Sequence, residues 1–175
     1  IVVVQKAVPG LYSDISSVEI DTYLAETAAA LTVEHPDYSY LAARIKVNSL
    51  HKETPGFIIA TKNLYEDGLL REDYYKKVME NADSIESVID YDKDYTFDYF
   101  ALTTLIRAYL LKFDNKTIER PQDLWMRVTL TVTGTEFNLD KIKETYKSLS
   151  GGKYTHATPT LFNSGLKMQQ LSSCF

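Results

Sequence analysis

The sequence predicts a mainly α-helical chain with one short β-hairpin. Apolar residues recur at helical spacing in several stretches of the 175-residue chain. Capping and stop signals mark where many of these stretches begin or end. The spacing then changes to that of strands around a pair of turn residues. Together these observations favour helices packed in two units, with the hairpin as a local interruption.

The first expected helix follows a capping box. Ser16 can accept a hydrogen bond from the amide of Glu19, while the Glu19 side chain reaches back to Ser16. The second helix opens at Pro36, where the missing N–H has no partner to lose, and it ends near residues 53–56. The apolar faces are Ile20, Tyr23, Leu24, Ala28 and Leu31 in the first helix, and Tyr38, Leu41 and Ile45 in the second.

Four more helices are expected further along the chain. They cover about 71–90, about 97–107, a stretch that Pro121 opens, and 139–149. Leu124 and Val128 should face inward, and Gly151-Gly152 should stop the last helix.

A short hairpin is predicted around Asp114-Asn115. The flanking runs 109–113 and 116–119 leave the helical period, and the two residues between them favour a turn. Pro, Gly and other turn residues also gather between residues 54 and 70, so we expect the seam between the two units there.

The bulk composition excludes several classes of protein. The formal net charge of -5 and the pI near 5.2 argue against duplex DNA or an anionic membrane as the main partner. No apolar run approaches the ~20 residues of a membrane helix. A single cysteine excludes a disulfide-stapled secreted domain and favours a reducing cytosol. We therefore expect a cytoplasmic protein that binds neither nucleic acid nor membrane.

The C-terminal stretch holds the residues with the most chemistry. Residues 154–165 are dense in hydroxyl groups, and Ser172-Ser173-Cys174 carries the only cysteine. A cysteine with apolar neighbours is more often an inert core residue than a functional thiol, and these polar neighbours bring the two interpretations near even. Taken alone, Thr158-Pro159-Thr160 is best explained as a rigid loop. The three histidines lack ligand spacing with cysteine or carboxylates, so no metal site is expected.

This C-terminal stretch resembles the start of the catalytic barrel in the large subunit of class I ribonucleotide reductase, in the eukaryotic style. The resemblance implies that Ser-Ser-Cys lies on the first strand of a ten-stranded α/β barrel. It implies that Cys174 is one member of a redox-active, disulfide-forming pair, whose partner and thiyl-radical cysteine lie further along the family's chain. Thr158, where many eukaryotic members carry Ser, and Ser173 would then line the nucleoside diphosphate site.

The N-terminal third resembles the later part of an ATP cone, the regulatory domain of the same family. The phrases that carry this resemblance are Gly10-Leu11-Tyr12-Ser13, residues 17–22, His35-Pro36-Asp37-Tyr38 and residues 50–54. The family's contacts with the allosteric nucleotide map onto Ser17 (usually Thr), Asp21 and Lys52. A lysine suits phosphates and an acid can accept from a ribose hydroxyl, although an acid early in a helix is stabilised by the helix dipole whatever it binds.

Residues 91–150 are similar to the family's helical N-terminal domain, so the resemblance covers the whole chain. It divides the chain into a partial ATP cone over 1–54, a helical domain over 55–153 and a barrel start over 154–175. The chain begins with Ile1 rather than Met and lacks the hairpin and first helix of the cone. We therefore expect a fragment that is inactive by itself and binds ATP weakly or not at all.

The resemblance implies a reductase that converts ribonucleoside diphosphates to deoxyribonucleotides for DNA synthesis by thiyl-radical chemistry. Implied partners are a small subunit with a di-iron tyrosyl radical, thioredoxin or glutaredoxin as reductant, and further copies of the large subunit. ATP and dATP would act as allosteric effectors, with no cofactor bound directly by this chain. The alternative is a non-catalytic helical regulatory or protein-interaction module in which Cys174 is a buried core residue.

Overall fold

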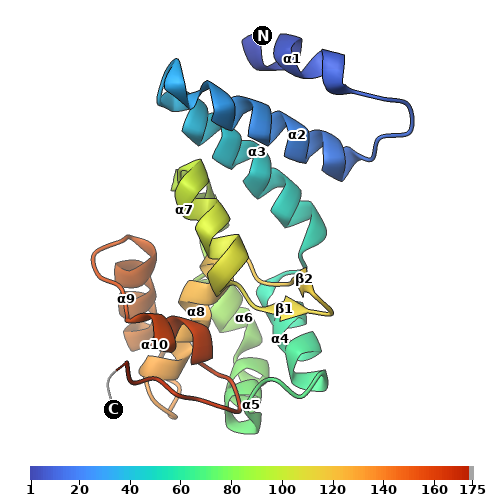
Figure 1. Ribbon diagram of the computed structural model, residues 1–175. Coiled ribbons are helices and arrows are strands. Elements are labelled where there is room, and N and C mark those ends of the chain that lie inside the picture. The colour runs from blue at the N-terminus through green and yellow to red at the C-terminus, as the bar shows by residue number, and fades with distance from the viewer. Residues whose placement is uncertain (174–175) are drawn as a thin grey trace.

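Helices make up most of the structure, a computed structural model in which residues 1–173 are described (Figure 1). The helices are α1 (Val2–Ala7), α2 (Ser17–Ala30), α3 (Asp37–Glu53), α4 (Phe57–Glu66), α5 (Glu72–Glu80), α6 (Ala82–Glu86), α7 (Tyr99–Thr104), α8 (Pro121–Val132), α9 (Leu139–Ser150) and α10 (Thr158–Asn163). Shorter turns are η1 (Val8–Gly10), η2 (Leu31–Val33), η3 (Tyr91–Thr96) and the π-helical η4 (Leu105–Tyr109), and the strands are β1 (Lys112–Phe113) and β2 (Lys116–Thr117). The mainly α prediction with one hairpin is confirmed. Within residues 1–173, no helix has the length and apolar character needed to span a bilayer.

The N-terminal group consists of α1, α2 and α3, with α2 and α3 lying side by side (Figure 1). The predicted capping box opens α2: the Glu19 amide donates to Ser16 Oγ over 3.2 Å, and the Ser16 amide donates to Glu19 Oε2 over 2.9 Å. Ala28 of α2 and Ala42 of α3 are fully buried in one cluster, and their small side chains allow the two long helices to pack closely.

The predicted core face of α3 is wrong by about one residue. Leu41 remains 40% exposed, and Tyr38 and Ile45 are only half-buried. The buried side of α3 instead carries Ala42, Ala43, Val47, Ser49 and Leu50. Alanines can sit deepest in a helix contact, and the larger side chains then border a groove shared with α1.

Most of the remaining elements pack around α8, which lies at the centre of the second group (Figure 1). Helix α7 instead packs against α3, where Leu102 contacts Ala43 and Val47. Leu124 and Val128 are fully buried in the core around α8, as predicted. The turn-rich stretch 54–70 contains α4, whose Phe57, Ala60 and Leu64 join this core, and that helix is absent from the sequence prediction. The helix expected over 71–90 is divided at Asn81, where the backbone leaves helical geometry between α5 and α6.

The hairpin forms at the predicted place. Lys112 pairs with Thr117 and Phe113 with Lys116 in antiparallel register. Asp114 and Asn115 have φ angles of 47° and 60°, the left-handed conformation that a tight hairpin turn demands.

The C-terminal segment returns to the core after α10. A short helix replaces the predicted rigid loop, because Pro159 fits the first turn of α10. The chain then turns at Gly165, whose φ of 77° and close approach to the Tyr74 ring favour glycine, and its carbonyl accepts from the Arg71 amide over 3.0 Å. An isolated bridge joins Leu70 to Leu166, and residues 167–173 run on without helix or strand. The strand expected around Ser-Ser-Cys is therefore not seen up to residue 173, and Cys174 lies outside the described residues.

Candidate functional site

The structure brings two of the predicted nucleotide-binding residues into direct contact. Lys52 Nζ lies 2.8 Å from Asp21 Oδ2. Asp21 lies in the second turn of α2, and Lys52 lies in the last turn of α3. Ser17 lies one helical turn before Asp21, so it shares that face of α2. The three predicted residues therefore gather where the start of α2 meets the end of α3.

The Asp21–Lys52 pair is available to a ligand. The Lys52 side chain is 63% exposed and that of Asp21 is 21% exposed. An exposed ion pair contributes about 0–1 kcal/mol, so replacing the partner of the lysine costs little. A phosphate could accept from Lys52, and an exchangeable carboxylate beside it could accept from a hydroxyl.

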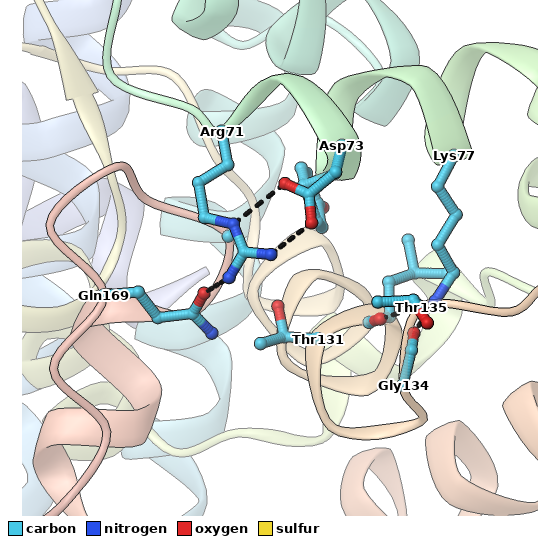
Figure 2. A pocket seen from close by; sticks show the side chains of 10 residues that line it. Arg71, Asp73, Lys77, Thr131, Gly134, Thr135 and Gln169 are labelled. Carbon is cyan, nitrogen blue, oxygen red and sulfur yellow. Dashed lines mark hydrogen bonds and ion pairs between the residues drawn. The ribbon is translucent and has the colours of Figure 1, made fainter.

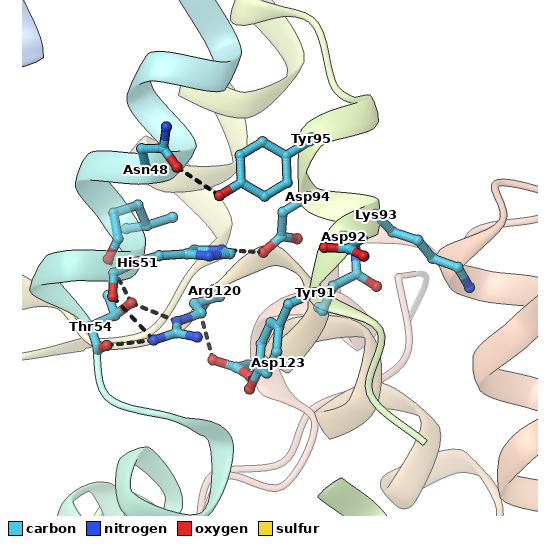
Figure 3. A network of polar contacts seen from close by, with 12 residues as sticks. Asn48, His51, Thr54, Tyr91, Asp92, Lys93, Asp94, Tyr95, Arg120 and Asp123 are labelled. Carbon is cyan, nitrogen blue, oxygen red and sulfur yellow. Dashed lines mark hydrogen bonds and ion pairs between the residues drawn. The ribbon is translucent and has the colours of Figure 1, made fainter. Parts of the chain in front are cut away.

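The end of α3 is held by a residue from another part of the chain. The Arg120 guanidinium donates to Thr54 Oγ1 over 2.9 Å and to the carbonyl oxygens of Thr54 and His51 over 2.8 and 3.2 Å (Figure 3). Arg120 is the N-cap residue of α8, and its guanidinium lies 4.8 Å from the centre of the Tyr91 ring. A cation at this position satisfies the carbonyls that a helix leaves unpaired at its C-terminus.

Buried acids surround this contact. His51 Nε2 lies 2.8 Å from Asp94 Oδ2, and Asp94 is fully buried (Figure 3). Burial raises the pKa of Asp94, against the opposing effect of the His51 hydrogen bond. Burial also raises the pKa of Asp123 to about 7, although the Arg120 amide and the Tyr91 hydroxyl donate to it over 2.8 and 2.7 Å.

A second arginine of α8 holds the hydroxyl-rich segment. Arg127 Nε lies 2.5 Å from Glu119 Oε1, and both side chains are almost fully buried. Arg127 Nη1 donates to the Ser164 carbonyl over 2.8 Å, and Glu119 Oε2 accepts from the Leu111 amide over 2.8 Å. One buried pair thereby joins the hairpin, α8 and the chain that follows α10.

Of the two predicted substrate residues, Thr158 lies within that segment and Ser173 follows it. Thr158 is exposed at the first position of α10, and Ser173 is exposed at the end of the described chain. Neighbouring residues tie the two parts together: Thr160 Oγ1 donates to the Leu171 carbonyl over 3.1 Å, and Asn163 Nδ2 donates to the Gln170 carbonyl over 2.7 Å. These bonds hold the chain against α10 just before Ser172 and Ser173.

A pocket between α5, the end of α8 and residues 165–169 contains none of the predicted residues (Figure 2). Arg71 contacts both Asp73 and Gln169 there. Lys77 donates to the carbonyls of Leu130 and Gly134, and burial lowers its pKa. The charged side chains of this pocket thus bind other parts of the protein, and Lys77 caps the C-terminal end of α8. Among residues 1–173, no group of three or more His, Cys, Asp or Glu side chains is placed to hold a metal.

Comparison with known proteins places the chain in a family. A family model described as "Ribonucleotide reductase, all-alpha domain" matches residues 95–169. The chain is 43% identical to the ribonucleoside-diphosphate reductase large subunit of Dictyostelium discoideum, over 99% of this chain and 21% of that protein. It is 40% identical to the large chain of Neurospora crassa and to the large subunit of Arabidopsis thaliana, over 100% of this chain and 20% and 22% of those proteins. The chain belongs to the ribonucleotide reductase large-subunit family. It spans about a fifth of the length of these relatives.

The sequence analysis missed two arginines whose side chains hold distant segments of the chain together. Arg120 and Arg127 occur within residues 91–150, where the sequence predicted helices and a hairpin but no site residue. The available signal was a charged residue within an otherwise apolar helical stretch, Met126-Arg127-Val128. Such a residue is buried only when it is paired, so it indicates a partner elsewhere in the chain.

Proposed function

We propose that the protein containing this chain is a ribonucleoside-diphosphate reductase and that the chain supplies part of its large subunit. The observation that carries this proposal is the 40–43% identity with proteins of that name along nearly the whole chain. Fold alone would not support an activity. Here the similarity extends through the hydroxyl-rich segment that carries the predicted substrate residues.

In the proposed reaction, a ribonucleoside diphosphate and two thiols give a deoxyribonucleoside diphosphate, a disulfide and water. A thiyl radical on a further cysteine removes the 3′ hydrogen, and the 2′ hydroxyl then leaves as water. The same cysteine finally returns a hydrogen atom to the 3′ carbon, which restores the thiyl radical. The thiol pair, of which Cys174 is one member, supplies two electrons and two protons. Thr158 and Ser173 bind the substrate, and thioredoxin or glutaredoxin returns the two electrons to the disulfide. Because the chain has one cysteine, it is inactive alone.

Activity in this proposal also depends on partners. A small subunit with a di-iron tyrosyl radical generates the thiyl radical, and large subunits assemble with one another in the cytoplasm. ATP and dATP regulate the enzyme from the site around Ser17, Asp21 and Lys52. The 2.8 Å contact between Asp21 and an exposed Lys52 supports this site, because the lysine can exchange its partner for a phosphate.

The replacement Cys174→Ser in the full-length protein tests the redox role. Reductant-driven turnover should fall to background while folding is nearly unchanged, because serine cannot form a disulfide. Turnover is measured with thioredoxin and with dithiothreitol, and Thr155→Ser in the same segment serves as the control. Normal multiple turnover by Cys174→Ser would favour the alternative, in which Cys174 is a core residue.

A further inference from the structure

The end of α3 is anchored on both sides of Lys52. His51 comes directly before Lys52. Its imidazole is hydrogen-bonded to Asp94, and its carbonyl accepts a hydrogen bond from Arg120. Thr54 lies two residues after Lys52, and both its hydroxyl and its carbonyl oxygen accept hydrogen bonds from Arg120 (Figure 3). The Lys52 side chain leaves in another direction, toward Asp21 on α2.

These anchors come from outside the N-terminal group of helices. Asp94 belongs to η3, and Arg120 precedes the first turn of α8. The Arg120 backbone is itself fixed, because its amide donates to Asp123 Oδ2 over 2.8 Å. The Tyr91 hydroxyl donates to the other oxygen of the same carboxylate over 2.7 Å. The position of Lys52 is therefore set relative to α8 as well as to α2.

Helix ends fray unless their last carbonyls are satisfied. Thr54 is the C-cap residue of α3, and its extended backbone ends the helical hydrogen bonding there. Arg120 supplies donors to the carbonyls of His51 and Thr54 with one rigid guanidinium, which the single ammonium of a lysine can replace only in part. Without Arg120, the last turn of α3 would sample more conformations, and the distance from Lys52 to Asp21 would vary.

We propose that Arg120 is a positioning residue of the effector-nucleotide site: it acts through the end of α3 to hold Lys52 beside Asp21. This inference rests on the proposed function, since it assumes that nucleotide phosphates bind at Lys52. It means that the regulatory site over residues 1–54 is completed by a side chain from the helical domain. The site is then sensitive to how those two parts of the chain pack.

A double-mutant cycle in the full-length protein tests this role, with dATP affinity measured by calorimetry. Arg120→Ala should weaken dATP binding about 5–10-fold in the otherwise unchanged protein. In a Lys52→Met background it should change the affinity less than twofold, because the residue that it positions is gone. Arg120→Lys should restore part of the affinity, and Arg44→Ala on the exposed side of α3 is the matched control.

The outcomes separate this inference from the function on which it rests. If Lys52→Met and Asp21→Asn bind dATP like the unchanged protein, the effector site itself is wrong, and the positioning role falls with it. If those two variants bind weakly but Arg120→Ala has the same effect in both backgrounds, or none, only the positioning role is overturned. Thr54→Val removes one acceptor of Arg120, together with the bond that the Thr54 hydroxyl donates to the Leu50 carbonyl, and changes the shape little, so it serves if Arg120→Ala does not fold. It should weaken dATP binding about 2–3-fold, and an unchanged affinity would count against the role of Arg120.

Discussion

Two ion pairs of this chain differ in how far they are buried and in what else they contact. The Lys52–Asp21 pair joins α2 to α3 with side chains that are 63% and 21% exposed, whereas the side chains of Arg127 and Glu119 are only 2% and 3% exposed. The buried pair is embedded in further hydrogen bonds to the Ser164 carbonyl and the Leu111 amide. The exposed pair can change partners at little energetic cost, and the buried one cannot. The comparison teaches that a charge suited to ligand binding is the one that the fold does not require.

The largest expected effect comes from breaking the buried pair. Arg127→Met should lower the free energy of unfolding by about 3–5 kcal/mol, because Glu119 would be left buried without its cation. Urea unfolding followed by circular dichroism measures this loss, and Arg107→Met, at an exposed position, is the control. The double replacement Arg127→Met with Glu119→Gln should be less destabilising than the sum of the two single changes. Additive losses would show that the two side chains act independently.

A third carboxylate sharpens the comparison, because Asp123 is buried without a direct side-chain ion pair in the described residues. Its pKa is raised to about 7, from an ordinary value of 3.8, so the folded state binds its proton more tightly than the unfolded state. The contribution of Asp123 to stability is therefore fully present below about pH 4 and is lost as the pH rises to about 7. Over that window the loss should amount to a few kcal/mol at most.

Asp123→Asn isolates this contribution. Unfolding free energies at several values between pH 4 and 8 should differ between the two proteins by a pH-dependent amount, with the loss on raising the pH reduced in the variant. An identical pH dependence in both proteins would mean that Asp123 is ionised throughout this range.

The smallest expected effect comes from the exposed pair. Without nucleotide, Lys52→Met should lower the free energy of unfolding by less than about 1 kcal/mol. The difference should shrink further in 1 M salt, where the Debye length is only about 3 Å. Lys46→Met on the same helix is the matched control, and thermal unfolding at two salt concentrations is the measurement. A loss comparable with that of Arg127→Met would remove the distinction between the two pairs.

Local signals predicted much of the fold, whereas the site residues remain predictions. The capping box at Ser16 and the turn at Asp114-Asn115 depend on neighbouring residues, and both occur where the sequence indicated. Local patterns did not predict three features: the exposure of Leu41, the break at Asn81 and the helix α4. In each case the packing of distant segments decided which residues are buried or where a helix ends.

By itself, the sequence determined the helical class, the positions of most elements and the family, because periodicity, caps and shared motifs are written in consecutive residues. Only the tertiary structure decided that Lys52 meets Asp21, that Arg120 holds the end of α3 and that Arg127 is buried against Glu119. These contacts join residues 31, 66 and 8 positions apart. They depend on which helix faces which, and helical spacing within a single element does not specify that choice.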